Sequence, residues 1–224
     1  MLDFKILPIS SYVSGLLVHL GLPSDHQPVT VRQLSESGGN SEGSFELILT
    51  HGDDRKFHAK LVSRADQDLV NIKGVMERNP QLLKDRRLSL PFAFIESGEG
   101  ENVLVVSPWI DHKYTLADAL MDFQLHGDIR GARELSLQFG EFLTSWIRDY
   151  AGQVSHSDCT PTNVLITKEG DFVLVDCLGM DDSLPNDDVN SFIRTIEFMA
   201  PIWPQDFAKQ VYGGFVSGLV TTSL

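Results

Sequence analysis

The hydrophobic periodicity of the chain changes near Pro108, and no other feature of the sequence constrains the fold as strongly. From residue 29 to residue 107, apolar and polar residues alternate in short runs rich in β-branched side chains, which is the pattern of half-buried strands. After Pro108, apolar residues recur at spacings of three and four, as they do on one face of a helix. The sequence therefore predicts an α+β protein with two lobes around a cleft, a β-rich lobe over residues 1–107 and a helical lobe over residues 108–224.

The first lobe is predicted to contain an N-terminal helix, a five-stranded antiparallel sheet and one further helix. Apolar residues at helical spacing place the N-terminal helix over residues 10–20, before Gly21 and Pro23. Strands are expected at 29–34, 44–49 and 56–62 and in a hairpin over 91–109, with the further helix over 65–87.

The second lobe is predicted to be mostly helical. Thr115 is expected to cap a helix that runs to Met121. Two short apolar runs, NVLIT and FVLVD, flank the turn KEGD and predict a buried hairpin, and helices are expected over 187–199 and after Pro204. Six apolar residues mark the buried face of a longer helix: Leu135, Phe139, Phe142, Leu143, Trp146 and Ile147.

Charge and composition exclude several classes of partner. The chain carries 18 basic and 31 acidic side chains, and its net charge of −13 repels nucleic-acid backbones and anionic membrane surfaces. It has no long uncharged apolar stretch for a membrane span and no basic start with an apolar run for a secretory signal. We therefore expect no nucleic-acid partner, no membrane span, and a cytoplasmic location unless a specialised export machinery reads another signal. The two cysteines, Cys159 and Cys177, are expected to be reduced thiols.

The strongest chemical signal is the run His156-Ser157-Asp158-Cys159-Thr160-Pro161-Thr162-Asn163, followed by Asp176 at the end of the predicted hairpin. Phosphoryl transfer needs such groups, because a carboxylate must orient or deprotonate the acceptor hydroxyl while a carboxamide and a second carboxylate hold Mg²⁺ against the nucleotide phosphates. The spacing lets one loop carry Asp158 and Asn163 and lets the hairpin return Asp176 beside them. The alternative is that Asp158 and Asn163 only cap a turn.

With every fixed position of the pattern H-x-D-x-x-P-x-N present, this loop resembles the protein kinase-like superfamily, which includes protein kinases and the aminoglycoside and choline phosphotransferases. The resemblance implies a bilobal kinase-like fold with ATP and Mg²⁺ as cofactors. It implies that Asp158 is the catalytic base, that Asn163 and Asp176 are Mg²⁺ ligands, and that His156 braces the loop.

The resemblance extends upstream into the β-rich lobe. Gly38, Gly39, Asn40 and Gly43 lie between two predicted strands, where the superfamily places a loop whose backbone amides cover the phosphates, although Asn40 stands in place of a glycine. By itself, a glycine-rich segment of this kind also fits an ordinary turn.

Lys60 lies in the following predicted strand and matches the superfamily's lysine for the α- and β-phosphates, with Glu77 as the residue that would orient its ammonium group. A lone lysine in an apolar strand also fits an edge-strand charge, and other acids lie near Glu77. The segment that contains Val106, Pro108 and Trp109 matches the hinge whose backbone groups bind adenine.

Asp188 opens a D-V-x-S-F sequence, which resembles the protein-kinase helix whose aspartate anchors the backbone of the catalytic loop. The stretch from Asp176 to Asp188 is too short for an activation loop, and Ser157 stands where regulated kinases carry an arginine. In this respect the chain is similar to the minimal kinases that some bacterial pathogens deliver into host cells.

The resemblance as a whole implies an ATP-dependent kinase that phosphorylates a hydroxyl group. A protein acceptor is the first expectation, because the interval from hinge to motif has no insertion that would wall off a small substrate. A small-molecule phosphotransferase of the aminoglycoside or choline type stays open, favoured by the N-terminal helix, Asn40 and Thr160. So does a pseudokinase that only binds a partner, although each of the expected ionic and metal-binding positions is filled.

Overall fold

The computed structural model describes residues 9–22, 29–35, 41–49, 55–97, 100–150, 153–181 and 186–221. It is a mixed α+β structure of helices and antiparallel sheets, as the sequence predicts. The chain divides into two compact units, one formed by Met1–Val70 and Leu90–Trp109 and the other by Asn71–Ser89 and Ile110–Leu224. Residues 71–89, which the sequence pattern placed in the first lobe, thus belong to the second unit, and backbone hydrogen bonds of Arg87 and Ser89 with Leu174 hold them there.

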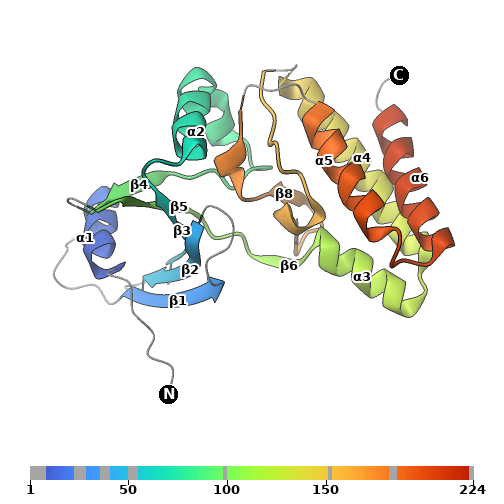
Figure 1. Cartoon of the computed structure of the whole chain (residues 1–224), viewed down its shortest axis with the longest axis horizontal. Helices are drawn as coiled ribbons and strands as arrows, with labels where there is room; N and C mark the ends of the chain where they lie inside the picture. The colour runs from blue at the N-terminus through green and yellow to red at the C-terminus, as the bar shows by residue number, and fades with distance from the viewer. Residues whose placement is uncertain are drawn as a thin grey trace. The chain divides into compact units, whose positions relative to one another are not determined.

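The first unit contains helix α1 (Ile9–His19) and a five-stranded antiparallel sheet in the order β1-β2-β3-β5-β4 (Figure 1). Its strands are β1 (Val29–Ser35), β2 (Ser41–Leu49), β3 (Arg55–Ser63), β4 (Ala93–Glu96) and β5 (Asn102–Pro108). The predicted strands are confirmed, because the alternating apolar residues that indicated them also form the buried face of the sheet.

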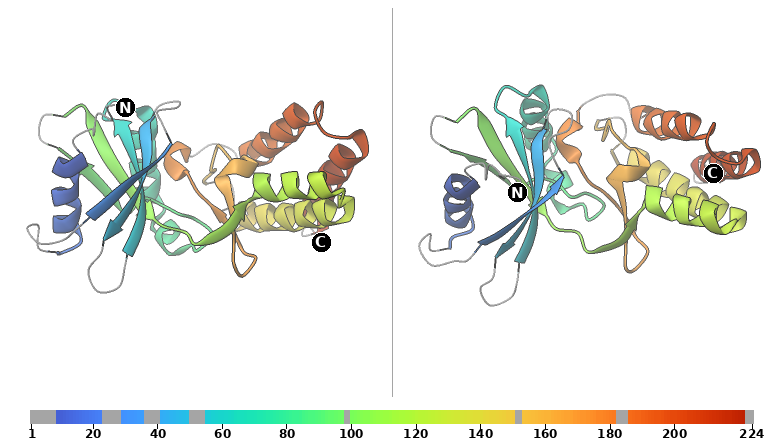
Figure 2. Two further views of the ribbon diagram at one scale, coloured as in Figure 1. Left: turned by 90° about the horizontal axis from the view of Figure 1, so that it is seen from below. Right: turned by 60° about the horizontal axis from the view of Figure 1, so that its bottom comes forward.

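Helix α1 covers one face of this sheet, as both views of Figure 2 show. Leu16 and Leu17 of α1 are buried together with alternate residues of the strands, which are Phe45, Leu47, Phe57, Ala59, Leu61, Leu104 and Val106. Successive residues of a strand point to opposite faces, so Lys60 lies on the face away from α1. In the strand register it pairs with Ser44 of β2 and Val105 of β5.

The second unit is mostly helical. Helix α2 (Gln67–Arg78) begins in the first unit, ends in the second and is followed by the 3₁₀ helix η1 (Pro80–Lys84). The helix expected over 65–87 is therefore interrupted, because Pro80 has no amide hydrogen with which to continue the α-helical pattern. The other helices are α3 (Leu116–His126), α4 (Ile129–Tyr150), α5 (Asn186–Met199) and α6 (Gln205–Thr221). No helix in the described part of the chain has the length and apolar character to cross a membrane.

A three-stranded antiparallel sheet in the order β6-β7-β8 completes the second unit. Strands β7 (Val164–Thr167) and β8 (Phe172–Leu174) form the predicted hairpin. Strand β6 (His112–Thr115), which pairs with β7, was not predicted, because its residues are partly or largely exposed and show no apolar alternation. Thr115 caps α3 as predicted, and the helix runs past Met121 to Gly127, whose left-handed backbone (φ 68°) ends it.

Helix α4 supplies the centre of the core. Phe139, Leu143 and Trp146 are fully buried, which confirms the predicted apolar face of this helix. The Phe139 ring contacts Phe192 of α5 and Phe215 of α6, with centroid distances of 4.8 and 6.0 Å. The same helix face therefore holds both later helices.

Helices α4 and α6 approach each other closely through glycines of α6. A Cβ atom on Gly214 would lie 2.3 Å from the carbonyl oxygen of Arg133, and one on Gly218 would lie 2.1 Å from that of Leu137. Neither position has room for a side chain. A Cβ atom on the neighbouring Gly213 would meet no atom within 4 Å.

We predict opposite effects of alanine at these neighbouring glycines. Gly214→Ala should lower the free energy of unfolding by about 1–3 kcal/mol, because it overpacks the contact between α4 and α6. Gly213→Ala should raise it by about 0.5–1 kcal/mol, because alanine favours the helix where space is open. Denaturant titration of both variants measures the difference, and equal effects would contradict the close approach of the two helices.

Candidate functional site

A buried carboxylate, Asp188, holds the loop that carries the sequence motif. Asp188 lies in the first turn of α5 and is fully buried. Its Oδ1 accepts hydrogen bonds from Ser155 Oγ and Ser157 N, both at 2.9 Å, and its Oδ2 accepts from Trp146 Nε1 at 3.0 Å and His156 N at 3.2 Å. Hydrogen bonds to a carboxylate are stronger than neutral ones, so Asp188 fixes the backbone where the loop begins. These bonds confirm the anchoring role expected for Asp188.

Beyond this anchor, the loop folds so that Asp158 and Asn163 touch. Asn163 Nδ2 donates to Asp158 Oδ2 at 2.7 Å and to the Asp158 carbonyl oxygen at 3.1 Å. The backbone of Thr160 bridges the two, donating to Asp158 O and accepting from Asn163 N, each at 2.9 Å. The Asp158 side chain is exposed to solvent while Asn163 is half-buried. The two side chains expected to share a site are therefore in direct contact at the surface of the second unit.

The strand that leads to Asp176 is attached to the same loop. Val175 N donates to Asn163 O at 2.9 Å, and Val175 O lies 2.8 Å from Nε2 of the buried His156, which donates to it. Asp176 follows Val175 and immediately precedes the 3₁₀ helix η3 (Cys177–Gly179). The β7–β8 hairpin thus returns Asp176 to the end of the loop that holds Asp158 and Asn163, and His156 braces this junction as expected.

The backbone is strained at two places in this site. Ser157 (φ 67°) and Asp176 (φ 61°) are the non-glycine residues with left-handed backbone in the described part of the chain. This conformation costs about 1–2 kcal/mol for an L-residue, and such strain collects at functional sites. Asp181 helps to hold Ser157, because its Oδ1 accepts from Ser157 Oγ at 3.2 Å while its backbone pairs with Ser155 at 3.1 and 3.3 Å.

The two cysteines beside the motif are not suited to nucleophilic chemistry. Both are free, as expected, and both are buried. Burial raises the pKa of the Cys159 thiol well above its ordinary value, and the nearby carboxylates of Asp188 and Asp158 act in the same direction. Cys177 Sγ donates to Leu174 O at 3.6 Å. Since the thiolate is the reactive form, the chemistry of this site falls to its oxygen and amide groups.

Asn163 and Asp176 offer a carboxamide and a carboxylate as possible ligands for a metal ion. Within the described ranges, no three His, Cys, Asp or Glu side chains form a group that could hold a metal ion. Mg²⁺ is usually held by one or two carboxylates together with phosphates and water. Asn163 Nδ2 is turned toward Asp158, which leaves the carboxamide oxygen as the atom that could ligate a cation beside Asp176.

The remaining predicted site residues lie elsewhere. The first unit contains five of them: Gly43 in β2, Lys60 in β3, Val106 and Pro108 in β5, and Trp109. In this unit, Lys56 Nζ lies over the Trp109 ring, 5.6 Å from its centroid. Glu77 is exposed near the end of α2, in the part of that helix assigned to the second unit. Gly38, Gly39 and Asn40 lie outside the described residues. Within the second unit, the structure brings Asp158 and Asn163 into contact and places Asp176 directly after Val175, whose amide is bonded to Asn163.

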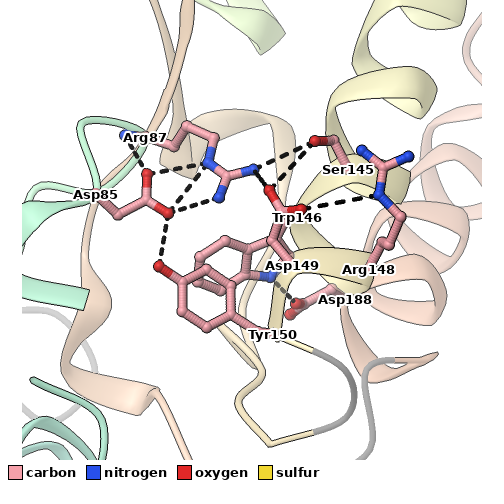
Figure 3. Close-up of polar contacts among 8 residues, drawn as sticks. All are labelled: Asp85, Arg87, Ser145, Trp146, Arg148, Asp149, Tyr150 and Asp188. Carbon is pink, nitrogen blue, oxygen red and sulfur yellow. Dashed lines mark hydrogen bonds and ion pairs between the residues drawn. The ribbon is translucent and has the colours of Figure 1, made fainter. Parts of the chain in front are cut away.

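Sequence reasoning missed the polar role of Trp146, which it assigned only to the apolar face of a helix. The indole ring is fully buried, yet its N–H donates to Asp188 (Figure 3). A signal was present, because a buried tryptophan needs an acceptor for its N–H group. The sequence alone does not say which acceptor that is.

No protein-family model matches the chain, and no curated protein matches it.

We predict that Asp188→Asn destabilises the second unit. An asparagine has one acceptor oxygen, so its NH₂ group would face two of the four donors that now bind the carboxylate. Each buried donor without an acceptor costs about 1–3 kcal/mol, so the loss of acceptors for two donors should lower the free energy of unfolding by about 2–6 kcal/mol in a denaturant titration. The control is Asp187→Asn at the exposed neighbouring position. Equal stability of the two variants would show that Asp188 is not the anchor.

Proposed function

We propose that the chain is a bilobal, kinase-like phosphotransferase that transfers the γ-phosphate of ATP to a hydroxyl group with the help of Mg²⁺. The observation that carries the proposal is the meeting of Asp158, Asn163 and the Val175–Asp176 segment, since Asn163 hydrogen-bonds to both of the others. A simple turn cap would need only the contact between Asp158 and Asn163. It would need neither the buried anchor at Asp188 nor a strained backbone at Asp176.

In this proposal Asp158 is the catalytic base. Its carboxylate is exposed, so an acceptor hydroxyl can reach it. Asn163 Nδ2 holds Oδ2 at 2.7 Å, which leaves Oδ1 as the oxygen that would orient the hydroxyl and take its proton. His156 and Asp188 hydrogen-bond to the backbone and side chains that support the loop, and act by holding it.

Asn163 and Asp176 are proposed to hold Mg²⁺, one through its carboxamide oxygen and the other through its carboxylate. The cation, when bound, neutralises charge on the nucleotide phosphates. The left-handed backbone of Asp176 turns the chain sharply after β8, and the hydrogen bond from Val175 N to Asn163 O keeps the two ligand-bearing residues together.

The nucleotide-binding residues are proposed from the sequence resemblance, and the place of Lys60 in the first unit supports the proposal. Lys60 lies on the sheet face away from α1, where a phosphate would not have to compete with the apolar core. The proposed contacts to ATP are Lys60, oriented by Glu77; the glycine-rich segment with Gly38, Gly39, Asn40 and Gly43; and the hinge residues Val106, Pro108 and Trp109.

A protein is the proposed acceptor. Between β5 and the motif, the described chain contains only β6, α3 and α4, and so lacks additional helices that would enclose a small substrate. The chain is proposed to be a bacterial effector kinase that acts either in the bacterial cytoplasm or in the cytoplasm of a host cell. A small-molecule phosphotransferase is the second candidate, and the N-terminal helix α1, packed on the sheet, favours it.

We predict that Asp176→Ala abolishes the Mg²⁺-dependent stabilisation of the protein by ATP. At a hundredfold excess of nucleotide over its dissociation constant, wild type should gain on the order of 2–3 kcal/mol, and the variant should gain almost nothing. Thermal melting with and without Mg²⁺ measures this, with Asp171→Ala, an exposed acid in the turn of the same hairpin, as the control. Equal stabilisation of wild type and Asp176→Ala would refute the metal assignment.

We also predict that Asp158→Asn binds Mg²⁺ and ATP with unchanged affinity but transfers no phosphate, because the base acts on the acceptor and not on the nucleotide. Calorimetric titration measures the affinity. Intact-protein mass spectrometry and ADP release measure transfer to the protein itself or to water. A folded Asp158→Asn protein that has lost nucleotide binding, or one that retains full transfer, would contradict the assignment of the base.

A further inference from the structure

A second polar cluster lies in the same unit and surrounds Arg87 (Figure 3). Asp85, which follows η1, accepts hydrogen bonds from the Arg87 backbone N (2.9 Å), Nε (3.0 Å) and Nη2 (2.7 Å). Its Oδ2 also accepts from the hydroxyl of Tyr150 at 2.7 Å. The guanidinium group is therefore fixed in place by a largely buried carboxylate that is itself held from helix α4.

The other side of the Arg87 guanidinium group faces helix α4. Nη1 donates to Asp149 Oδ2 at 2.9 Å and to Ser145 Oγ at 3.4 Å. The guanidinium carbon lies 5.7 Å from the ring centroid of Trp146 and 5.9 Å from that of Tyr150, within the range of cation–π attraction. A planar guanidinium group can stack on aromatic rings while the donors at its edge bind carboxylates.

The charges of this cluster are stable at neutral pH. Burial would raise the pKa of Asp85, but the hydrogen bonds from Arg87 and Tyr150 outweigh it and hold the pKa below its ordinary value. The hydrogen bond to Asp85 raises the pKa of Arg87 further above its already high value. The ion pair therefore persists across the pH range in which the protein would work.

The backbone of the same segment holds the strand that leads to Asp176. Leu174 N donates to Arg87 O at 2.7 Å, and Ser89 N donates to Leu174 O at 2.9 Å. Residues 87–89 thus run beside the end of β8, with a parallel bridge between Leu88 and Leu174. Asp176 follows shortly after this attachment.

The side chain of Arg87 reaches the other part of the candidate site through Trp146. The indole N–H of Trp146 donates to Asp188 Oδ2 at 3.0 Å, and the same oxygen accepts from His156 N. The ring also packs against Tyr150, with 4.4 Å between ring centroids. A shift of the indole ring would therefore change the anchor of the loop that carries Asp158.

We propose that Arg87 is a positioning residue of the phosphotransfer site, and the proposal rests on the function proposed above. Its side chain acts through Trp146 and Asp188 on the loop that carries Asp158, while its backbone holds the strand that carries Asp176. One residue thereby sets the base and the metal ligand relative to each other, without contacting the nucleotide or the acceptor.

The test compares Arg87→Met with Arg148→Met. Both remove a guanidinium group near Asp149, but Arg148 is largely exposed and contacts only that carboxylate, at 3.8 Å, in the drawn cluster. Trp146→Phe serves as a third variant, because it keeps an aromatic ring under Arg87 and removes the N–H donor to Asp188, together with part of the buried ring volume. Thermal melting selects conditions in which each variant is folded, and Arg87→Lys replaces Arg87→Met if the latter does not fold.

Two readouts are measured on each folded variant. Hydrogen exchange follows the backbone amides of His156 and Ser157, which Asp188 protects. Steady-state kinetics and calorimetry separate turnover from the affinity for ATP with Mg²⁺. We expect faster exchange at these amides in Arg87→Met and Trp146→Phe, with turnover reduced about ten- to a hundredfold and nucleotide affinity changed by less than about twofold. Arg148→Met should match wild type in both readouts.

The two proposals fail in different ways. If wild type neither binds ATP with Mg²⁺ nor transfers phosphate, the proposed function is refuted, and with it the catalytic meaning of Arg87. Exchange at His156 and Ser157 then still decides whether Arg87 supports the loop. If wild type is active, a folded Arg87→Met protein with wild-type exchange or wild-type turnover overturns the proposal for Arg87 alone.

Discussion

The arrangement of the second unit depends on one buried carboxylate, which accepts more hydrogen bonds than a neutral side chain in its place could accept. Asp188 accepts four hydrogen bonds, two of them from backbone amides of the motif loop. A buried charge is costly unless it is fully hydrogen-bonded, so the loop and Trp146 must take the positions that satisfy it. The constraint runs in both directions, because the carboxylate fixes the loop and the loop makes the buried charge tolerable.

From this anchor, a short series of hydrogen bonds sets the candidate site. Asn163 contacts Asp158 through its side chain and Val175 through its backbone, while His156 holds Val175 from the other side. The strained backbone conformations of Ser157 and Asp176 persist only because these contacts hold them in place. The proposed function requires such a fixed arrangement, because electrostatic stabilisation of a transferring phosphate depends on groups that are already in place.

Much of this could be predicted from the sequence, where local patterns decide the structure. The alternation of apolar and polar residues predicted the strands of the first unit, and the spacing of Phe139, Leu143 and Trp146 predicted the buried face of α4. The D-V-x-S-F sequence pointed to Asp188 as an anchor. By contrast, strand β6 has no apolar pattern, and the pairing of residues 87–89 with β8 depends on a contact between distant segments. The roles of Arg87 and Trp146 depend on such tertiary contacts too, so no local pattern could reveal them.

We propose that a metal-bound nucleotide lies beside Asp176, just after the end of β8, and paramagnetic broadening tests this most directly. Mn²⁺ would replace Mg²⁺, together with a non-hydrolysable ATP analogue, and nuclear magnetic resonance would follow the backbone amides of Val175 and Asp176 and the side-chain amide of Asn163. We predict that these signals broaden at low Mn²⁺ only when the nucleotide is present, and before the amides of the exposed turn at Asp171. Sharp signals at all three positions, with broadening elsewhere in the chain, would contradict the claim.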